Sequence, residues 1–229
     1  MTQTARYTGQ IAVHKTPARL LEFIDNLNQA PTTEYASIHA GSTRPHEVGG
    51  RRVYSNIRLV AQDYSRKGEP STRVTANISP IAALFIAEAA SSNRDSFLFE
   101  STKIFGTPDE KGYSPMAKLW ITRESTTKDG EVLRRPWKID IENGKGVKHT
   151  SENGGTSCER GTYVQEKKVA LLFTDFEFYE LLTAVKRFIK LWEALYGANL
   201  IKEGRNEREM SRVAYQNNKT IDEQNIWEE

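Results

Sequence analysis

Hydrophobic and polar side chains alternate along two neighbouring stretches in the first half of the chain, residues 51–61 and 72–78. A period of two is typical of a strand that buries one face and leaves the other in solvent. The segment between them, residues 63–70, is charged and ends in a proline, which predicts a turn. We therefore expect an antiparallel pair of strands here.

The same period predicts four more strands further along the chain, over residues 96–105, 117–123, 137–142 and 162–173. The third is the clearest, because three apolar residues alternate with three charged ones: Trp137, Ile139 and Ile141 against Lys138, Asp140 and Glu142. Residues 145–161 are rich in Gly, Ser and Lys, which predicts a mobile connection.

Three helices are predicted, each beginning at a hydroxyl residue that can cap its first turn. In two of them a proline follows the hydroxyl, and proline is favoured at the first helical position. The start signals are Thr16-Pro17, Ser79-Pro80 and Thr174-Asp175, and they predict helices over residues 17–29, 81–90 and 176–196. Gly197 is a candidate C-cap for the last helix.

These elements predict an α+β fold with antiparallel sheets, in which four strands and a helix occur twice. An N-terminal arm and helix (1–50) would precede this two-unit core (51–197). A polar tail (198–229) would follow it, either loose or as an exposed helix. The tail has seven acidic and five basic residues from position 202 onward, around an Ile226-Trp227 pair that could dock a protein partner.

Composition narrows the class of protein. The 229 residues are 38% hydrophobic and 27% charged, and no apolar run approaches the roughly 20 residues of a membrane span. Residues 1–15 lack the apolar core of a secretory signal. Cys158 is the single cysteine, so neither an internal disulfide nor a cysteine-based zinc site can form. We expect a soluble cytoplasmic protein with no membrane contact.

Residues for catalysis or for holding a metal or cofactor are sparse. No two of the four histidines have the helical i, i+4 spacing of a metal site; they are His14, His39, His46 and His149. No glycine-rich loop with a following Lys-Ser or Lys-Thr opens a helix, so a nucleotide P-loop is absent. We expect no cofactor, no metal and no catalysis.

One group of acidic residues supports an alternative hypothesis, in which the protein is an enzyme. Asp140 and Glu142 would lie on one face of a strand, and the next strand carries Glu166 and Lys168. Metal-dependent nucleases of the restriction type hold magnesium with such a set. A salt-bridged, solvated strand face explains the same residues without catalysis.

Basic and aromatic residues predict a different function. Residues 51–168 contain 20 Lys and Arg against 15 Asp and Glu. Cations on a sheet can meet phosphates while exposed rings stack on unpaired bases, which suits single-stranded nucleic acid. A solvated sheet face remains the simpler alternative. The candidate binding residues are Arg52, Tyr54, Arg58, Arg73, Lys103, Lys118, Trp120, Lys138, Lys145, Lys148, Lys167 and Lys168.

A family resemblance favours the nucleic-acid hypothesis. Trp-Lys-Ile-Asp-Ile at 137–141, a glycine-rich stretch, Lys-Lys-Val-Ala-Leu at 167–171 and a helix opened by Thr174-Asp175 resemble the transcriptional coactivator called positive cofactor four. Two such units in one chain resemble the Whirly proteins, over about residues 50–197. The resemblance implies a twisted antiparallel sheet that binds single-stranded DNA or RNA, no catalysis, and self-association. A magnesium-dependent nuclease and a protein-interaction adaptor remain the alternatives.

Overall fold

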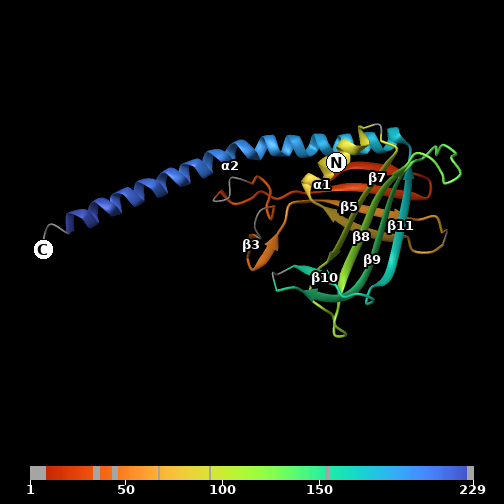
Figure 1. Cartoon of the computed structure of the whole chain (residues 1–229), viewed down its shortest axis with the longest axis horizontal. Helices are drawn as coiled ribbons and strands as arrows, with labels where there is room; N and C mark the ends of the chain where they lie inside the picture. Colours follow the sequence, from red (N-terminus) through yellow and green to blue (C-terminus); the bar gives the residue numbers. More distant parts are fainter. Residues whose placement is uncertain are drawn as a thin grey trace, which may run out of the picture. The chain divides into compact units, whose positions relative to one another are not determined.

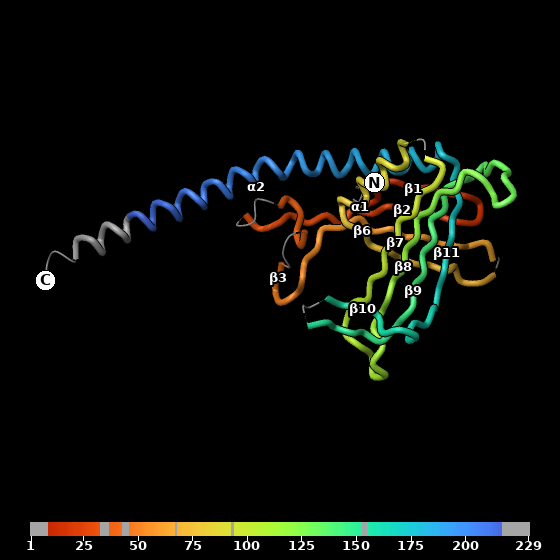
Figure 2. The backbone as a smooth tube through the Cα atoms, viewed as in Figure 1, coloured from red at the N-terminus to blue at the C-terminus, as the bar shows by residue number. Residues whose placement is uncertain are grey.

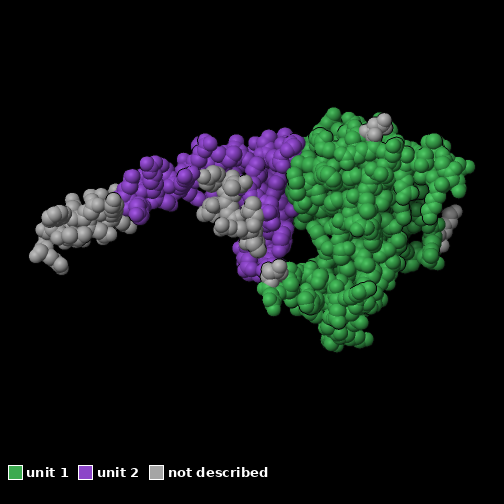
Figure 3. Space-filling view, in the orientation of Figure 1, with its two compact units in different colours: residues 1–26, 56–188 green, residues 27–55, 189–229 purple. Residues whose placement is uncertain are grey.

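A computed structural model describes residues 9–32, 37–42, 46–66, 68–92, 94–152 and 155–225, with side chains described up to residue 216 (Figure 1). The chain divides into two compact units, coloured green and purple in Figure 3. Unit 1 contains residues 1–26 and 56–188, and unit 2 contains residues 27–55 and 189–229.

Unit 1 contains two antiparallel sheets. The first sheet has the strand order β1-β2-β5-β6, and α1 (Pro80–Ala90) follows it in the chain. Its strands are β1 (Gln10–Lys15), β2 (Arg19–Asn26), β5 (Asn56–Asp63) and β6 (Thr72–Ile78). The predicted strand at 72–78 and the helix after Ser79 are confirmed, and the Ser79 hydroxyl accepts a hydrogen bond of 3.2 Å from the N–H of Ala82.

The predicted helix at 17–29 is wrong, because this segment forms β2 of a hairpin with β1. The Thr16 hydroxyl does accept backbone N–H bonds, from Ala18 and Arg19, but it closes the hairpin turn instead of capping a helix. Leu21 is fully buried while its neighbour Leu20 lies half-buried on the other face. Both faces of β2 are partly buried, so apolar side chains also occupy positions between the inward-facing residues. The resulting run of apolar residues resembles the apolar face of a helix. Of the predicted N-terminal arm, residues 1–8 lie outside the described residues.

The second sheet is built around two long strands that Figure 2 traces side by side, β8 (Tyr113–Glu124) and β9 (Trp137–Thr150). The strand β7 (Ser96–Ile104) pairs with β8, and β11 (Val164–Phe173) pairs with β9. The short strand β10 (Thr156–Cys158) pairs with the far end of β9. The mobile connection predicted from residue 145 onward is therefore wrong up to Thr150 and again over β10.

Two glycines of β9 explain why the segment predicted to be mobile is ordered. A Cβ at Gly144 would overlap the carbonyl oxygen of Val164, and one at Gly146 would overlap the Cys158 sulfur. The end of β10 and the start of β11 therefore lie close against β9 at these two glycines, which have no side chains. These glycines serve close packing, whereas glycine-rich composition usually indicates flexibility.

The long helix α2 (Asp175–Asn225) begins with a reciprocal cap. The Thr174 hydroxyl accepts from the N–H of Glu177 at 3.2 Å, and the Glu177 carboxylate accepts from the N–H of Thr174 at 2.8 Å. The predicted start is thus confirmed, but the predicted end at Gly197 is wrong. Within unit 2 an added Cβ at Gly197 would lie 3.0 Å from the Ile38 side chain, so this glycine permits close packing inside a continuous helix.

The core of unit 1 is closed by aromatic rings. Trp137 and Phe178, both nearly inaccessible, stack with ring centroids 4.1 Å apart, and Phe173 contacts Phe178 at 5.9 Å. The Trp137 N–H donates to Asp175 at 2.8 Å, so the start of α2 is tied to the first residue of β9.

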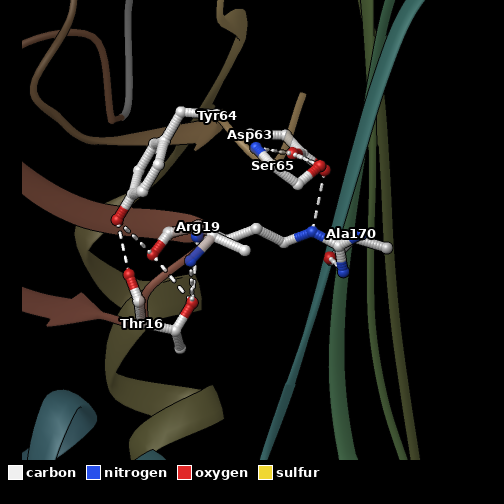
Figure 4. A network of polar contacts seen from close by, with 7 residues as sticks. Thr16, Arg19, Asp63, Tyr64, Ser65 and Ala170 are labelled. Atoms are coloured by element: carbon white, nitrogen blue, oxygen red, sulfur yellow. Dashed lines mark hydrogen bonds and ion pairs between the residues drawn. The ribbon is translucent and has the colours of Figure 1, made fainter. Parts of the chain in front are cut away.

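Two polar links hold the sheets together. Arg19 donates from Nε to Asp63 and from a terminal nitrogen to the carbonyl of Ala170 on β11, both at 2.8 Å (Figure 4). The Asn143 side chain on β9 makes two hydrogen bonds with the backbone of Thr75 on β6, at 2.7 and 2.8 Å. Because β6 and β11 are edge strands, these bonds use backbone groups that no neighbouring strand of their sheets takes.

Unit 2 combines a hairpin with the later part of α2. The strands β3 (His46–Val48) and β4 (Arg51–Val53) are joined by two glycines with φ of 60° and 74°, the conformation of a tight hairpin turn. His39 contacts the Ser55 hydroxyl at 2.8 Å and Glu193 at 3.3 Å, and its ring stacks on Trp192 at 4.8 Å. Burial lowers the pKa of His39, against the opposing effect of Glu193.

Candidate nucleic-acid interface

One face of the second sheet, which we call the outer face, turns away from the core. Strand register places its residues in three rows across β7, β8, β9 and β11. The rows are Leu98-Thr122-Lys138-Leu172, Glu100-Trp120-Asp140-Ala170 and Thr102-Lys118-Glu142-Lys168. The alternate residues of β8 and β9, such as Leu119 and Ile141, are buried in the core. This alternation is the one that the sequence predicted.

Lys168 is held by two carboxylates on the neighbouring strand. Its ammonium lies 3.1 Å from Asp140 and 2.9 Å from Glu142. Asp140 also pairs with Lys138 at 3.0 Å. Both carboxylate residues are more than nine-tenths buried, with 6% and 8% exposure, so their charges need these partners. The hydrogen bond to Glu142 is the main cause that raises the pKa of Lys168.

Tyr163 closes one border of this cluster. Its hydroxyl donates to Glu142 at 3.3 Å, and the ammonium of Lys118 lies 3.5 Å from the centre of its ring. Burial, followed by the charge of Glu142, raises the pKa of Tyr163 to about 12. The phenol is therefore neutral at physiological pH and can donate to the carboxylate.

Trp120 is half-buried in the middle row, and its indole N–H donates to Glu100 at 3.0 Å. Beside it the surface has a depression of about 270 Å³. The depression is lined by Trp120, Thr122, Lys138, Asp140, Glu142 and Lys168. An aromatic ring, two ammonium groups and two carboxylates therefore meet in one concave part of the outer face.

Four of the twelve predicted binding residues lie together on the outer face: Lys118, Trp120, Lys138 and Lys168. Lys148 follows further along β9, where its ammonium donates to the carbonyl of Gly106 at 3.2 Å.

Three other predicted lysines lie on the opposite face of the same sheet. Lys103 is opposite Ala117, and Lys167 is opposite Asn143, the residue that bonds to β6. Lys145 follows two positions after Asn143 and pairs with Glu166 at 3.6 Å. The sequence placed Lys103 and Lys118 on one face, but Lys103 pairs with the neighbour of Lys118, so the two point to opposite sides.

The remaining four predicted residues belong to other parts of the molecule. Arg58 and Arg73 lie on the first sheet, opposite Asn77 and Gln62. Arg52, on β4, and Tyr54 belong to unit 2, where Arg52 lies 3.9 Å from Glu47. The single basic face expected from the sequence is thus divided among several surfaces.

The acidic set of the nuclease alternative is only partly assembled. Asp140, Glu142 and Lys168 converge, but Glu166 falls where the β11 register shifts and pairs with Lys145 instead. A bulge of this kind re-aims one side chain. Within the described ranges no group of three or more His, Cys, Asp or Glu side chains could hold a metal ion.

Sequence reasoning missed Glu100 and Tyr163. Glu100 faces Trp120 only through the pairing of β7 with β8. Tyr163 precedes β11 and reaches Glu142 from a loop. Neither residue stands in a local pattern that marks it, so no signal in the sequence could have identified them.

Among the helices of the described chain, none is both long and apolar enough to cross a bilayer. Comparison of the chain with family models, with curated proteins and with solved structures gives no match.

Proposed function

We propose that this protein binds single-stranded nucleic acid across the outer face of the second sheet, largely independently of sequence. The observation that carries the proposal is Trp120, half-exposed on an open sheet between Lys118 and Lys138. The bond to Glu100 occupies the indole N–H, which leaves the ring itself for stacking. Stacking is useful only against unpaired bases, because a duplex hides their faces.

The order of the elements supports the same proposal. Four strands of the first sheet are followed by α1, and the second sheet is followed by α2. The resemblance to positive cofactor four and the Whirly proteins implies this repeated order. Self-association is a further proposal from the resemblance. Partner docking at the C-terminal tip is proposed from the sequence alone, since Ile226 and Trp227 lie outside the described residues.

The charges on the second sheet limit how the phosphate backbone of a nucleic acid would be bound. Lys138 and Lys168 on the outer face already neutralise Asp140 and Glu142. Lys118 has no carboxylate partner in the described part of the chain, and Lys167, exposed on edge strand β11, has none there either. We expect Lys118 to meet a phosphate and the paired lysines to shape the site, because Lys167 lies on the opposite face of the sheet.

The test is a titration against single-stranded and duplex oligonucleotides of one sequence in the same buffer. We expect clear preference for the single strand, since only it offers base faces to Trp120. Equal or tighter binding to the duplex would contradict the proposal. Failure to bind either form would leave the interaction adaptor, and magnesium-dependent cleavage of the oligonucleotide would favour the nuclease.

A further inference from the structure

One carboxylate oxygen of Asp140 has no hydrogen-bond partner among the described residues, although the residue is only 6% exposed. Its Oδ2 takes both ammonium groups, from Lys138 and Lys168. Its Oδ1 is inaccessible to solvent and, among the described residues, accepts no hydrogen bond. A buried acceptor without a donor destabilises the folded protein, and more so when the group is charged.

Asp140 lines the depression beside Trp120, so a donor bound there is next to this carboxylate. Register places Trp120 directly opposite Asp140 on one side and the small Ala170 on the other. The residues that line the depression therefore include this carboxylate, the indole of Trp120 and the ammonium groups of Lys138 and Lys168. A ligand that satisfies all three needs a flat ring, an N–H donor and an adjacent acceptor.

We propose that this depression binds one unpaired nucleobase through its exocyclic amino group, with the ring against Trp120. The inference rests on the proposed function and adds a base preference to it. Cytosine offers an amino donor beside a ring-nitrogen acceptor, which match Asp140 and a lysine. Thymine and uracil offer one N–H between two carbonyls, and both carbonyls would face the Asp140 carboxylate. Amino-bearing bases are therefore favoured.

The test compares two oligomers of equal length with the unaltered protein. One is oligodeoxycytidine, and the other carries pyrimidin-2-one, which is cytosine without its amino group. We expect binding to the second to be weaker by about fivefold or more, because a buried acceptor is left unpaired. Equal affinity for the two oligomers overturns this inference and leaves the proposed function standing. Binding to neither overturns both.

A variant assigns the effect to Asp140. The amide of Asp140→Asn can present either a donor or an acceptor to the depression. The affinities for the two oligomers should then differ by no more than about twofold. Asp129→Asn is the matched control, because it makes the same change at an exposed turn that does not line the depression. It should keep the discrimination. Loss of discrimination in both variants would overturn the role of Asp140.

Discussion

At the scale of single residues, a substitution of Trp120 can distinguish a role in binding nucleic acid from a role in folding. Its ring is half-exposed and Trp137 provides the buried indole of the core. Trp120→Ala should weaken binding to single strands by about 1–3 kcal/mol and change the melting temperature little. Tyr215→Ala, at an exposed position of α2, is the control and should change neither. A large fall in melting temperature with unchanged affinity would make Trp120 a structural residue.

Lys168 and Lys167 are adjacent and have different roles. Lys168→Met leaves two buried carboxylates with less compensation, so the free energy of unfolding should fall by about 2–4 kcal/mol. Lys167→Met removes an exposed lysine without a carboxylate partner in the described chain and should cost under about 0.5 kcal/mol. Denaturant unfolding of both variants checks this. Similar stabilities would show that the carboxylates keep water or other partners.

At the scale of elements, Asp63 ties the β1–β2 hairpin to β11 through Arg19. Hydrogen bonds from Ser65, then the contact with Arg19, lower the pKa of Asp63 from 3.8 to about 2. A lowered folded-state pKa adds stability above the unfolded value, and that stability is lost as pH falls from 3.8 toward 2. Asp63→Asn should therefore be less stable at neutral pH, by about 1.5–3 kcal/mol, and lose less on acidification.

The measurement is unfolding by denaturant at several pH values between neutral and 2. Asp129→Asn, in the exposed turn between β8 and β9, is the control and should follow the wild-type curve. Parallel curves for Asp63→Asn and wild type would mean that the ion pair contributes nothing to the acid dependence.

The two glycines of β9 allow another element to pack on it. Gly144→Ala would push a methyl group into the backbone of Val164, which cannot yield without moving β11. We expect a loss of at least about 2 kcal/mol. The methyl group of Gly146→Ala would overlap only the Cys158 sulfur and would meet Met116 and Thr162 at ordinary contact distance, so Cys158→Ala in the same chain should restore part of its stability. Thermal unfolding of the two single variants and the double variant checks the order.

At the scale of the whole molecule, the predicted basic residues are distributed over several surfaces, which limits how strongly the affinity for nucleic acid depends on salt. Of the seven predicted lysines on the second sheet, Lys138, Lys145 and Lys168 are in ion pairs, and Lys103 and Lys167 lie on the opposite face, which leaves Lys118 and Lys148. Each neutralised phosphate contributes about −0.7 to the slope of log affinity against log salt. We therefore expect a slope no steeper than about −1.5. A much steeper slope would require the arginines of the first sheet or of unit 2.

Local signals in the sequence determined the α+β class, the strand at 72–78, the alternation at 137–142 and the starts of α1 and α2. Caps and side-chain periodicity act between residues within a few positions, so the sequence contains them in full. Thr16-Pro17 carried such a signal too, yet there the pairing of β2 with β5 made the segment a strand.

Only the tertiary structure decided the composition of the site. The register of β7 on β8 separates Lys103 from Lys118, and the shift in β11 withdraws Glu166 from Asp140 and Glu142. The same pairing gives Lys168 two buried carboxylates as partners and sets Trp120 opposite Asp140. A one-residue change of register reverses which side of the sheet a residue faces. Register is set by contacts between distant segments, so the sequence named the residues and the fold determined which of them meet.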